Sequence, residues 1–344
     1  MATDSCSNSR GQAFAAMKLL IVVYHRFDLW NAPPWFAERL GKDFPRIEIV
    51  HLASYEGVEE QLHDSEIVFT ISLRPEQFAL AKKLRWIHAP AAAVHQLLIP
   101  EVVNSDVVVT NAREVHGPVV AEHVIALVFA LAKKIPQAVR LQQRRVWGQE
   151  LMWNDGPKPR ELAGATLGLI GLGSIGREVA RRASALGMRV IGVREHAERE
   201  KPPWIDEVFT SDRLEQMLAQ SDYLVLAAPL TPATRGLMNA KRLRAMKPDA
   251  YLINVGRGPL IDAAALVEAL KERRIAGAAL DVFEQEPLPE DSPLWNLDHL
   301  LITPHTAALT EKLWQRHYHL FSQNLRRYVE GEPLLFVVDK QKGY

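Results

Sequence analysis

The chain has 344 residues, which is enough for about two domains with separate cores. Its 41 basic and 41 acidic residues give a formal net charge of zero, which argues against attraction to nucleic acid or to an anionic membrane. The single cysteine, Cys6, excludes an internal disulfide and a cysteine-ligated zinc site, and no apolar run approaches the ~20 residues of a membrane span. We therefore expect a cytoplasmic protein without a metal site.

The first half of the chain has the pattern of an α/β unit. Residues 1–16 lack periodicity, and we expect a disordered N-terminal extension there. From Met17 to about Asn111, apolar runs typical of strands alternate with helical patterns. The runs are LLIVVY, IEIVHL, IVFTIS, LRWIHA and DVVVTN. This alternation predicts a parallel sheet covered by helices.

A long apolar helix is predicted next, from about Val119 to Lys134. Pro136 is expected to close it, because proline cannot continue a helix without losing a hydrogen bond. The segment from Arg144 to Leu162 holds two tryptophans and two prolines and has little regular pattern. We predict an exposed connection there, with aromatic side chains that suit an interface.

A second α/β unit starts at Thr166 with a strand, a glycine turn, a helix and a second strand. Gly171, Gly173 and Gly176 have the GxGxxG spacing, which allows a tight turn, close approach of the backbone to a pyrophosphate, and close packing of helix on strand. The phosphates would lie at a helix N-terminus, which favours anions. Such a turn also occurs without a ligand, but the flanking pattern favours a dinucleotide site.

Arg194 stands at the end of the second strand of this unit, where an NAD site usually carries an acid. An aspartate there would repel a 2′-phosphate, whereas arginine offers that phosphate a fork of donors. The residue therefore predicts a preference for NADP(H), with NAD(H) as the alternative cofactor. Two other interpretations stay open: a surface arginine that is indifferent to the cofactor, and a Glu195 that points inward and serves the ribose.

Three residues whose side chains could take part in a reaction follow later strands of the second unit. These strands are YLVLAAP, AYLINVG, GAALDVF and LLITPH, with a helix from Asp262 to Arg274 among them and a last helix at about Glu311 to Tyr328. Each residue has a structural explanation by itself, as a surface arginine, a helix-start acid and a loop histidine. They are Arg257, Glu286 and His305.

Together, these three residues suit the reduction of a 2-keto acid. Arginine binds a carboxylate with two parallel donors, and histidine can give or take a proton near neutral pH. A carboxylate beside that histidine would favour its charged form and fix its tautomer. Open α/β sheets bind ligands at the carboxyl ends of their strands, where all three residues are expected.

Five segments carry a family resemblance: GLGSIG, PLTPATRGLMN from Pro229, INVGRGPLID from Ile253, ALDVFEQEPLP from Ala279 and TPHTAA from Thr303. They are similar to the successive signatures of the D-isomer-specific 2-hydroxyacid dehydrogenases, including glyoxylate/hydroxypyruvate reductases. The resemblance extends from about Leu84 to the end of the chain. It implies that His305 is the acid/base, Glu286 its partner and Arg257 the substrate-binding arginine. It also implies cofactor contacts from Ser174, Ile175, Ala228, Val255 and Asp281. We expect further cofactor contacts from Gly171, Gly173, Gly176, Arg194, Pro229 and Gly256.

The resemblance implies a fold of two Rossmann-like or flavodoxin-like domains, each a doubly wound parallel sheet, with a cleft between them. Residues 17–111 and 307–344 would form the substrate-binding domain, and residues 112–306 the dinucleotide-binding domain. The family generally forms dimers through the latter domain, so a homodimer is expected. The implied activity is hydride transfer between NADP(H) and a small 2-keto or D-2-hydroxy acid, for which glyoxylate and hydroxypyruvate are sensible first trials.

One loop departs from the family pattern. Relatives usually carry a Ser-Ala-Gly-Val-Asp type sequence there, whose backbone N–H groups help to hold the substrate carboxylate. This chain has Ala91, Ala92, Ala93, Val94 and His95. Backbone donors survive a change from glycine to alanine if φ stays negative, so Ala92, Ala93 and Val94 are still expected to bind substrate. For His95 a packing or capping role is favoured over catalysis.

Two alternative functions use the same fold. One is an NAD(P)(H)-sensing binding protein of the corepressor type, and the other is a formate dehydrogenase. Formate dehydrogenases carry glutamine where this chain has Glu286, which counts against the second alternative.

Overall fold

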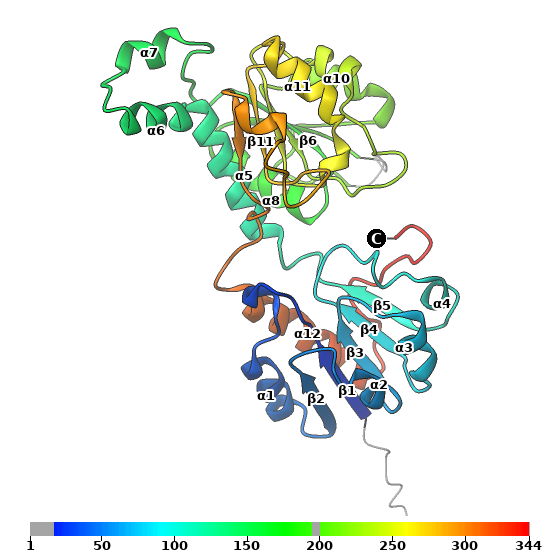
Figure 1. Ribbon diagram of the computed structural model, residues 1–344. Coiled ribbons are helices and arrows are strands. Elements are labelled where there is room, and N and C mark those ends of the chain that lie inside the picture. The colour runs from blue at the N-terminus through cyan, green and yellow to red at the C-terminus, as the bar shows by residue number, and fades with distance from the viewer. Residues whose placement is uncertain (1–16, 195–199, 344) are drawn as a thin grey trace, which may run out of the picture. The chain divides into compact units, whose positions relative to one another are not determined.

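The computed structural model describes residues 17–194 and 200–343 (Figure 1). The described chain forms two compact units. Unit 1 contains the described residues up to Arg113 and those from Trp314 onward, and unit 2 runs from Glu114 to Leu313. The predictions for residues 1–16 and for Glu195 fall outside the described residues.

Unit 1 is built on a five-stranded parallel sheet with the strand order β2-β1-β3-β4-β5. The chain leaves β1 for one side of the sheet and later returns to the other side, so β1 marks a topological switch point. Every apolar run predicted for this part of the chain forms a strand. The strands are β1 (Met17–Val22), β2 (Ile47–Leu52), β3 (Ile67–Thr70), β4 (Trp86–Ala89) and β5 (Val108–Asn111).

Helices cover both faces of this sheet. Three short helices cover one face: two of them contribute Val58, Leu62 and Val102 to an apolar cluster with the strands, and the third packs Phe78 against it. On the other face, Phe36 and Phe321 pack against Phe69 of β3, with ring centroids 5.2 and 4.8 Å away. The first group is α2 (Val58–Leu62), α3 (Pro75–Leu80) and α4 (Pro100–Val103), and the second is α1 (Pro34–Asp43) and α12 (Leu313–Val329), with the short η1 (Asp28–Trp30) before α1.

Unit 2 contains a seven-stranded parallel sheet with the order β12-β11-β10-β9-β6-β7-β8. Its switch point lies between β6 and β9. The three-residue strand β8 was not predicted. The strands are β6 (Thr166–Ile170), β7 (Arg189–Val193), β8 (Glu207–Phe209), β9 (Tyr223–Leu226), β10 (Tyr251–Asn254), β11 (Gly277–Leu280) and β12 (Leu300–Ile302).

Unit 2 is doubly wound as well. One apolar cluster joins the sheet to α5 (Gly117–Ala132) and α8 (Ser174–Ala185). The other joins its opposite face to α9 (Leu214–Leu218), α10 (Ala240–Ala245) and α11 (Ala263–Lys271). Asp262, where the predicted helix begins, caps α11 by accepting a hydrogen bond from the Ala265 N–H. Short 3₁₀ segments complete the unit: η2 (Ser211–Arg213), η3 (Gly258–Leu260) and η4 (Pro293–Asn296).

The segment after α5 differs from the prediction. Pro136 does not close α5, which ends at Ala132, because Lys134 with φ of 55° breaks the helix first. Pro136 lies instead in the first turn of α6 (Ile135–Gln143), where a proline sacrifices no helical hydrogen bond. The supposedly irregular stretch from Arg144 to Leu162 contains α7 (Gln149–Asn154). The Lys134 ammonium anchors that helix by donating to the carbonyl oxygens of Met152, at 2.7 Å, and Asp155.

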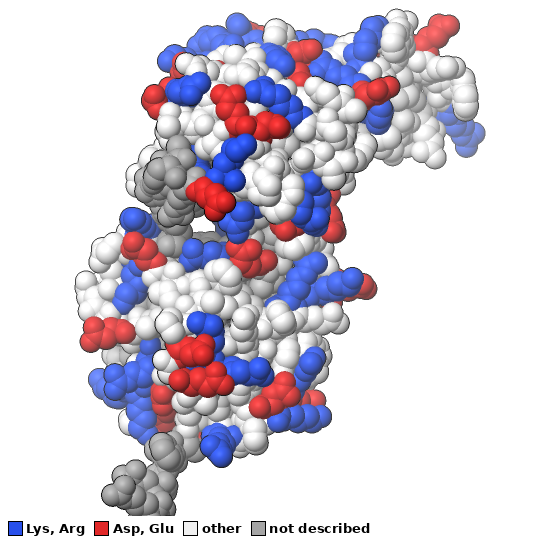
Figure 2. All heavy atoms as spheres, turned by 180° about the vertical axis from the view of Figure 1, so that it is seen from behind, with Lys and Arg blue, Asp and Glu red and all other residues white. Residues whose placement is uncertain are grey.

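Lys and Arg side chains are interspersed with Asp and Glu on the face that Figure 2 displays. That mixture agrees with the balanced composition of the chain. No helix among residues 17–194 and 200–343 is long and apolar enough to cross a membrane.

Candidate active site

The glycine turn follows β6, and two of its glycines are required by the protein itself. Gly171 has φ of 97°, and a Cβ there would lie 2.8 Å from the Ala227 carbonyl oxygen. A Cβ on Gly176 would lie 2.1 Å from the carbonyl oxygen of Gly171. The first glycine therefore permits the turn, and the second lets α8 pack against it.

Gly173 has no such constraint. Its φ of −75° is open to any residue, and nothing lies within 4 Å of the position that a Cβ would take. It directly precedes Ser174 and Ile175, the first residues of α8, whose N-terminal N–H groups favour an anion. Neither the backbone conformation nor the packing therefore requires a glycine at this position. A glycine at an open helix N-terminus instead fits the close approach of a dinucleotide pyrophosphate to the backbone.

The other predicted cofactor residues also follow strands of this sheet. Ala228 and Pro229 come after β9, Val255 and Gly256 after β10, and Asp281 after β11. Arg194 follows β7 and donates to the Glu200 carbonyl oxygen at 3.3 Å. Because all strands of the sheet are parallel, their carboxyl ends share the edge that carries the glycine turn. This edge is where doubly wound sheets bind their ligands.

His305 and Glu286 lie next to each other at this edge. The Nδ1 atom of His305 is 2.6 Å from Oε2 of Glu286, and both side chains are partly exposed. The other oxygen of Glu286, Oε1, accepts a hydrogen bond from the Phe283 N–H at 2.9 Å. With one oxygen held by the backbone, the carboxylate is oriented toward the histidine. His305 itself adopts the left-handed region, with φ of 54°.

Arg257 lies in the turn after β10, directly before η3, and is partly buried. One of its guanidinium N–H groups donates to the Gly256 carbonyl oxygen at 2.7 Å. Asn254 shapes this turn: its amide donates to the Arg257 carbonyl oxygen at 2.9 Å and its Oδ1 accepts from the Gly256 N–H at 3.0 Å. Burial lowers the pKa of Arg257, while Glu286 opposes the shift; a guanidinium still stays charged at neutral pH.

Gly258 brings the arginine turn against the loop that carries Glu286. A Cβ on Gly258 would lie 2.0 Å from the Phe283 carbonyl carbon. This is the close backbone approach that only glycine permits. The structure thus gathers the loops of the predicted catalytic residues at one edge of unit 2.

Asp281 is buried, and its carboxylate accepts hydrogen bonds from neighbouring groups of the protein. Its Oδ1 accepts hydrogen bonds from the Thr303 hydroxyl at 2.7 Å and from the Thr306 N–H at 2.8 Å. The Ala307 N–H lies 3.1 Å from Oδ2. Asp281 therefore ties down the chain on both sides of His305. The sequence predicted a cofactor contact for Asp281 but did not single out Thr303 or Asn254, which lie in strand-end segments without a periodic signal.

The predicted substrate loop belongs to unit 1. Ala92 is exposed and Val94 is buried, and the amide of Asn111 donates to the Ala92 carbonyl oxygen at 2.8 Å. The Ala112 N–H donates to the Ala91 carbonyl oxygen at 3.1 Å. The loop is thus held to the end of β5. His95 is exposed, which does not fit a packing role within this unit, and the alternative capping role stays a prediction.

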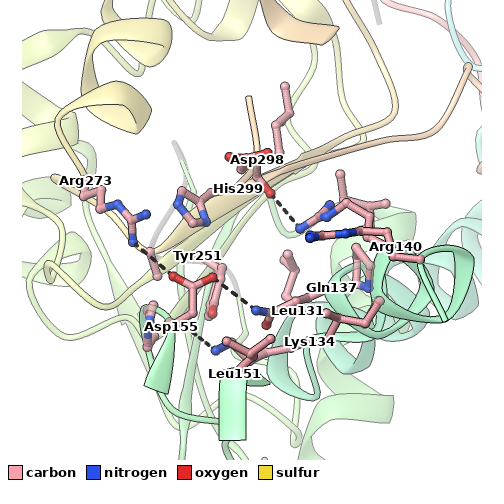
Figure 3. A pocket seen from close by; sticks show the side chains of 18 residues that line it. Leu131, Lys134, Gln137, Arg140, Leu151, Asp155, Tyr251, Arg273, Asp298 and His299 are labelled. Atoms are coloured by element: carbon pink, nitrogen blue, oxygen red, sulfur yellow. Dashed lines mark hydrogen bonds and ion pairs between the residues drawn. The ribbon is translucent and has the colours of Figure 1, made fainter. Parts of the chain in front are cut away.

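A cavity of about 410 Å³ lies elsewhere in unit 2 (Figure 3). Tyr251 and Leu300, the first residues of β10 and β12, line it, so it is at the amino ends of the strands. Asp155 points into this region, with Arg273 at 4.0 Å and the Gln137 amide at 3.1 Å. The chemistry-bearing residues are at the opposite edge. In the described part of the chain, no cluster of three or more His, Cys, Asp or Glu residues could hold a metal ion.

Comparison with known proteins decides the family. The model of the NAD-binding domain of the D-isomer specific 2-hydroxyacid dehydrogenases matches residues 125–307, more than half of the chain. The chain belongs to this family. A glyoxylate reductase from Thermofilum pendens is 36% identical over 278 residues, which cover 80% of each protein. The D-3-phosphoglycerate dehydrogenase of Methanocaldococcus jannaschii is 32% identical over 299 residues, 86% of this chain, which spans only 56% of that longer relative.

A solved structure extends the similarity to the whole fold. The D-isomer specific 2-hydroxyacid dehydrogenase from Xanthobacter autotrophicus Py2, in complex with NADPH and MES, matches with a TM-score of 0.81 and 31% identity. The match covers 96% of this chain and 100% of that one. These findings confirm two Rossmann-like α/β domains and an NAD(P)-dependent oxidoreductase of the 2-hydroxyacid dehydrogenase family.

Proposed function

We propose that the protein reduces a small 2-keto acid to the D-2-hydroxy acid, with NADPH as the preferred cofactor. The observation that carries the proposal is the 2.6 Å contact between His305 Nδ1 and Glu286 Oε2, on the sheet edge that also carries the glycine turn. Glyoxylate and hydroxypyruvate are the first substrates to try, because a relative with 36% identity is a glyoxylate reductase.

The contact assigns a role to each nitrogen of His305. If Nδ1–H donates to the Glu286 carboxylate, Nε2 is the atom that exchanges a proton with substrate. In the reductive direction Nε2–H protonates the carbonyl oxygen, and the neutral imidazole keeps its proton on Nδ1. In the oxidative direction Nε2 takes the proton from the hydroxyl. The negative charge of Glu286 stabilises the imidazolium form, as a carboxylate partner does in other acid/base pairs.

Arg257 serves as the carboxylate clamp in this proposal. A guanidinium carries five N–H groups, and one of those of Arg257, on Nη1, donates to the Gly256 carbonyl oxygen at 2.7 Å. A planar pair of donors matches the two oxygens of a substrate carboxylate. NADPH would be held by the glycine turn and the start of α8, and when bound it supplies the hydride.

We assign unit 2 the dinucleotide-binding role and unit 1 the substrate-binding role. The glycine turn and the residues proposed to touch the cofactor lie between Gly171 and Asp281, inside unit 2. Unit 1 supplies the loop of Ala92, Ala93 and Val94, whose backbone N–H groups suit a substrate carboxylate. The domain roles are those predicted from the sequence, and the two compact units divide at 113/114 and 313/314.

Arg194 is the residue proposed to set cofactor preference. It directly follows β7, the position from which doubly wound domains contact the adenosine ribose. The Xanthobacter autotrophicus structure, which contains NADPH, supports the phosphorylated cofactor by analogy. The sensing alternative gains no support from the comparisons.

The test is a steady-state panel of keto acids with NADPH and with NADH, followed at 340 nm. We expect turnover of glyoxylate or hydroxypyruvate with a higher kcat/KM for NADPH than for NADH. Arg194→Asp should reverse the preference by raising the KM for NADPH, whereas Arg244→Asp, at an exposed position of α10, should not. Turnover that favours NADH, with a preference that Arg194→Asp leaves unchanged, would disprove the cofactor assignment. Tight cofactor binding without turnover of any keto acid would favour the sensing function instead.

We also propose a homodimer that forms through unit 2. The segment of α6 and α7 leaves Trp147 93% exposed and Trp153 56% exposed, and large exposed aromatic side chains are typical of interfaces. Light scattering coupled to size exclusion tests this: the wild type should elute as a dimer. Trp153→Glu should shift it toward the monomer, while Trp295→Glu, at another exposed tryptophan of the unit, should not. The cytoplasmic location and the absence of a nucleic-acid partner stay predictions.

A further inference from the structure

His123 is a polar residue in the mostly apolar helix α5. Its side chain is 20% exposed, and its Nε2 atom lies 3.1 Å from the Thr303 hydroxyl oxygen and 3.6 Å from Oδ1 of Asp281. Thr303 belongs to the loop that carries His305, and Asp281 accepts hydrogen bonds from that loop. The mechanism above uses neither contact of His123.

The direction of these hydrogen bonds can be worked out. The Thr303 hydroxyl has one proton, and it lies 2.7 Å from Oδ1 of Asp281, an acceptor when the carboxylate is ionised. Thr303 must therefore donate to Asp281. Its oxygen is then an acceptor toward His123, so Nε2 of His123 carries the proton. The result is a relay in which His123 donates to Thr303 and Thr303 donates to Asp281.

The relay ends at the residue that fixes the catalytic loop. Asp281 also accepts hydrogen bonds from the backbone N–H groups of Thr306 and Ala307, at 2.8 and 3.1 Å. Its own carbonyl oxygen accepts from the His305 N–H at 2.9 Å. His305 is held in the left-handed region, which non-glycine residues adopt only when the surrounding structure imposes it.

The Asp281 carboxylate is only 1% exposed. Within residues 17–194 and 200–343, the Asp281 carboxylate has one basic side chain within 4.0 Å, that of His123. Burial lowers the pKa of His123, and the charge of Asp281 opposes that shift. Nε2–H is present in both the neutral form required here and the imidazolium, so the donor persists as the pH changes.

We infer that His123 is a positioning residue, which acts through Thr303 and Asp281 to hold the loop of residues 303–307 and thereby orient His305. The inference rests on the proposed function, because it assigns His305 the proton transfer. It requires a donor at one point in space rather than a histidine ring. A general acid/base held in the wrong orientation loses rate without losing cofactor affinity.

Substitutions separate the donor from the bulk of the ring. In His123→Gln the side-chain amide nitrogen reaches about as far as Nε2 and can still donate to Thr303, whereas His123→Leu fills similar space without a donor. Thr303→Ser keeps the relay and Thr303→Val breaks it. We expect His123→Leu and Thr303→Val each to lower kcat by about 10- to 100-fold, with the KM for NADPH unchanged. His123→Gln and Thr303→Ser should stay within about threefold of the wild type.

Additivity provides a second criterion. Since His123 and Thr303 act in series, the double variant His123→Leu/Thr303→Val should lose about as much kcat as either single variant. The matched control is His299→Leu, because His299 is partly buried and stands just before β12, at the opposite edge of the same sheet. This control should leave kcat unchanged.

Amide hydrogen exchange tests the inference without turnover. The Thr306 and Ala307 N–H groups should exchange faster in His123→Leu and Thr303→Val than in the wild type, and at the wild-type rate in His123→Gln. Wild-type kcat and exchange in His123→Leu would overturn the inference, as would a His123→Gln variant as impaired as His123→Leu. If the wild type reduces no keto acid while exchange follows the expected order, the proposed function fails and the positioning of the loop by His123 is supported.

Discussion

The two units are both doubly wound parallel sheets, but their strand orders differ and so does the turn after their first strand. In both, the chain leaves the first strand, β1 or β6, at the switch point of a parallel sheet. After β6 come Gly171 and Gly173, and α8 begins at once with Ser174. After β1 come Val23 and Tyr24 without a glycine, and the first α-helix starts only at Pro34. The doubly wound fold therefore offers a ligand position in both units, but only the backbone of unit 2 is built to approach a pyrophosphate.

The histidines of the two units show the same contrast. His305 follows the end of β12, where its side chain is half exposed and contacts Glu286. His88 lies inside β4, fully buried, with its ring stacked 5.2 Å from that of Phe69. In a parallel sheet, a residue past the strand end can meet a ligand, whereas a residue within the strand joins the core.

Removal of the exposed histidine should have the largest effect. His305→Ala is expected to lower kcat by about 10²- to 10⁴-fold, because proton transfer by a positioned side chain contributes on that order. The Kd for NADPH, measured by fluorescence titration, should stay close to that of the wild type. His299→Ala, at the opposite edge of the sheet, serves as the control. Near-normal turnover of His305→Ala would show that a residue past the strand end is not the acid/base.

The glycine turn offers a matched pair of substitutions with smaller effects. Gly176→Ala should destabilise unit 2 by about 1–3 kcal/mol, because its Cβ would lie 2.1 Å from a backbone oxygen. Gly173→Ala has room for its Cβ, so the free energy of unfolding should change by less than about 0.5 kcal/mol. Its Kd for NADPH should nevertheless rise by about tenfold or more, which corresponds to ~1.4 kcal/mol. Equal NADPH affinity in Gly173→Ala and the wild type would contradict the role of this glycine in the approach of the pyrophosphate to the backbone.

Much of the fold could be predicted from the sequence because the strands are buried on both faces. A strand such as β6 is then an uninterrupted apolar run, which stands out without any alignment. The exceptions have physical causes. Strand β8 has three residues, too few for a pattern, and α6 and α7 leave apolar side chains such as Leu151 and Trp153 exposed. The prediction that Pro136 closes α5 was wrong because proline is as compatible with a first helical turn as with the end of a helix.

The candidate site could be predicted in part, because its reactive side chains follow the ends of strands. Arg257, Glu286 and His305 were singled out for that reason, and the structure gathers their loops at one sheet edge. His123 and Asn254 were not, since both lie within helical or strand segments and have no local signal. The contact between His123 and Thr303 joins residues 180 positions apart, which no periodicity can reveal.

The buried histidine of unit 1 gives an effect that depends on pH and develops only in acid. Burial lowers the pKa of His88 to about 3, against an ordinary value of 6.5. The Thr110 hydroxyl, which accepts a hydrogen bond from the Trp86 indole at 2.7 Å, lies 2.8 Å from Nδ1 of His88. Between pH 6.5 and about 3, His88 therefore binds a proton in the unfolded chain but not in the folded chain.

The sign of the pH dependence follows. The contribution of His88 to stability is complete above its unfolded pKa and is lost as the pH falls, by about 1.4 kcal/mol for each pH unit below 6.5. Urea unfolding of the wild type and of His88→Met from pH 7 to pH 4.5 measures it. The variant should be the less stable protein at pH 7, and its disadvantage should shrink as the pH falls, because methionine does not titrate. His63→Met, at an exposed histidine of the same unit, should keep the wild-type slope. If His88→Met also kept that slope, His88 would not stay neutral in the fold, and its contrast with His305 would not rest on burial within the strand.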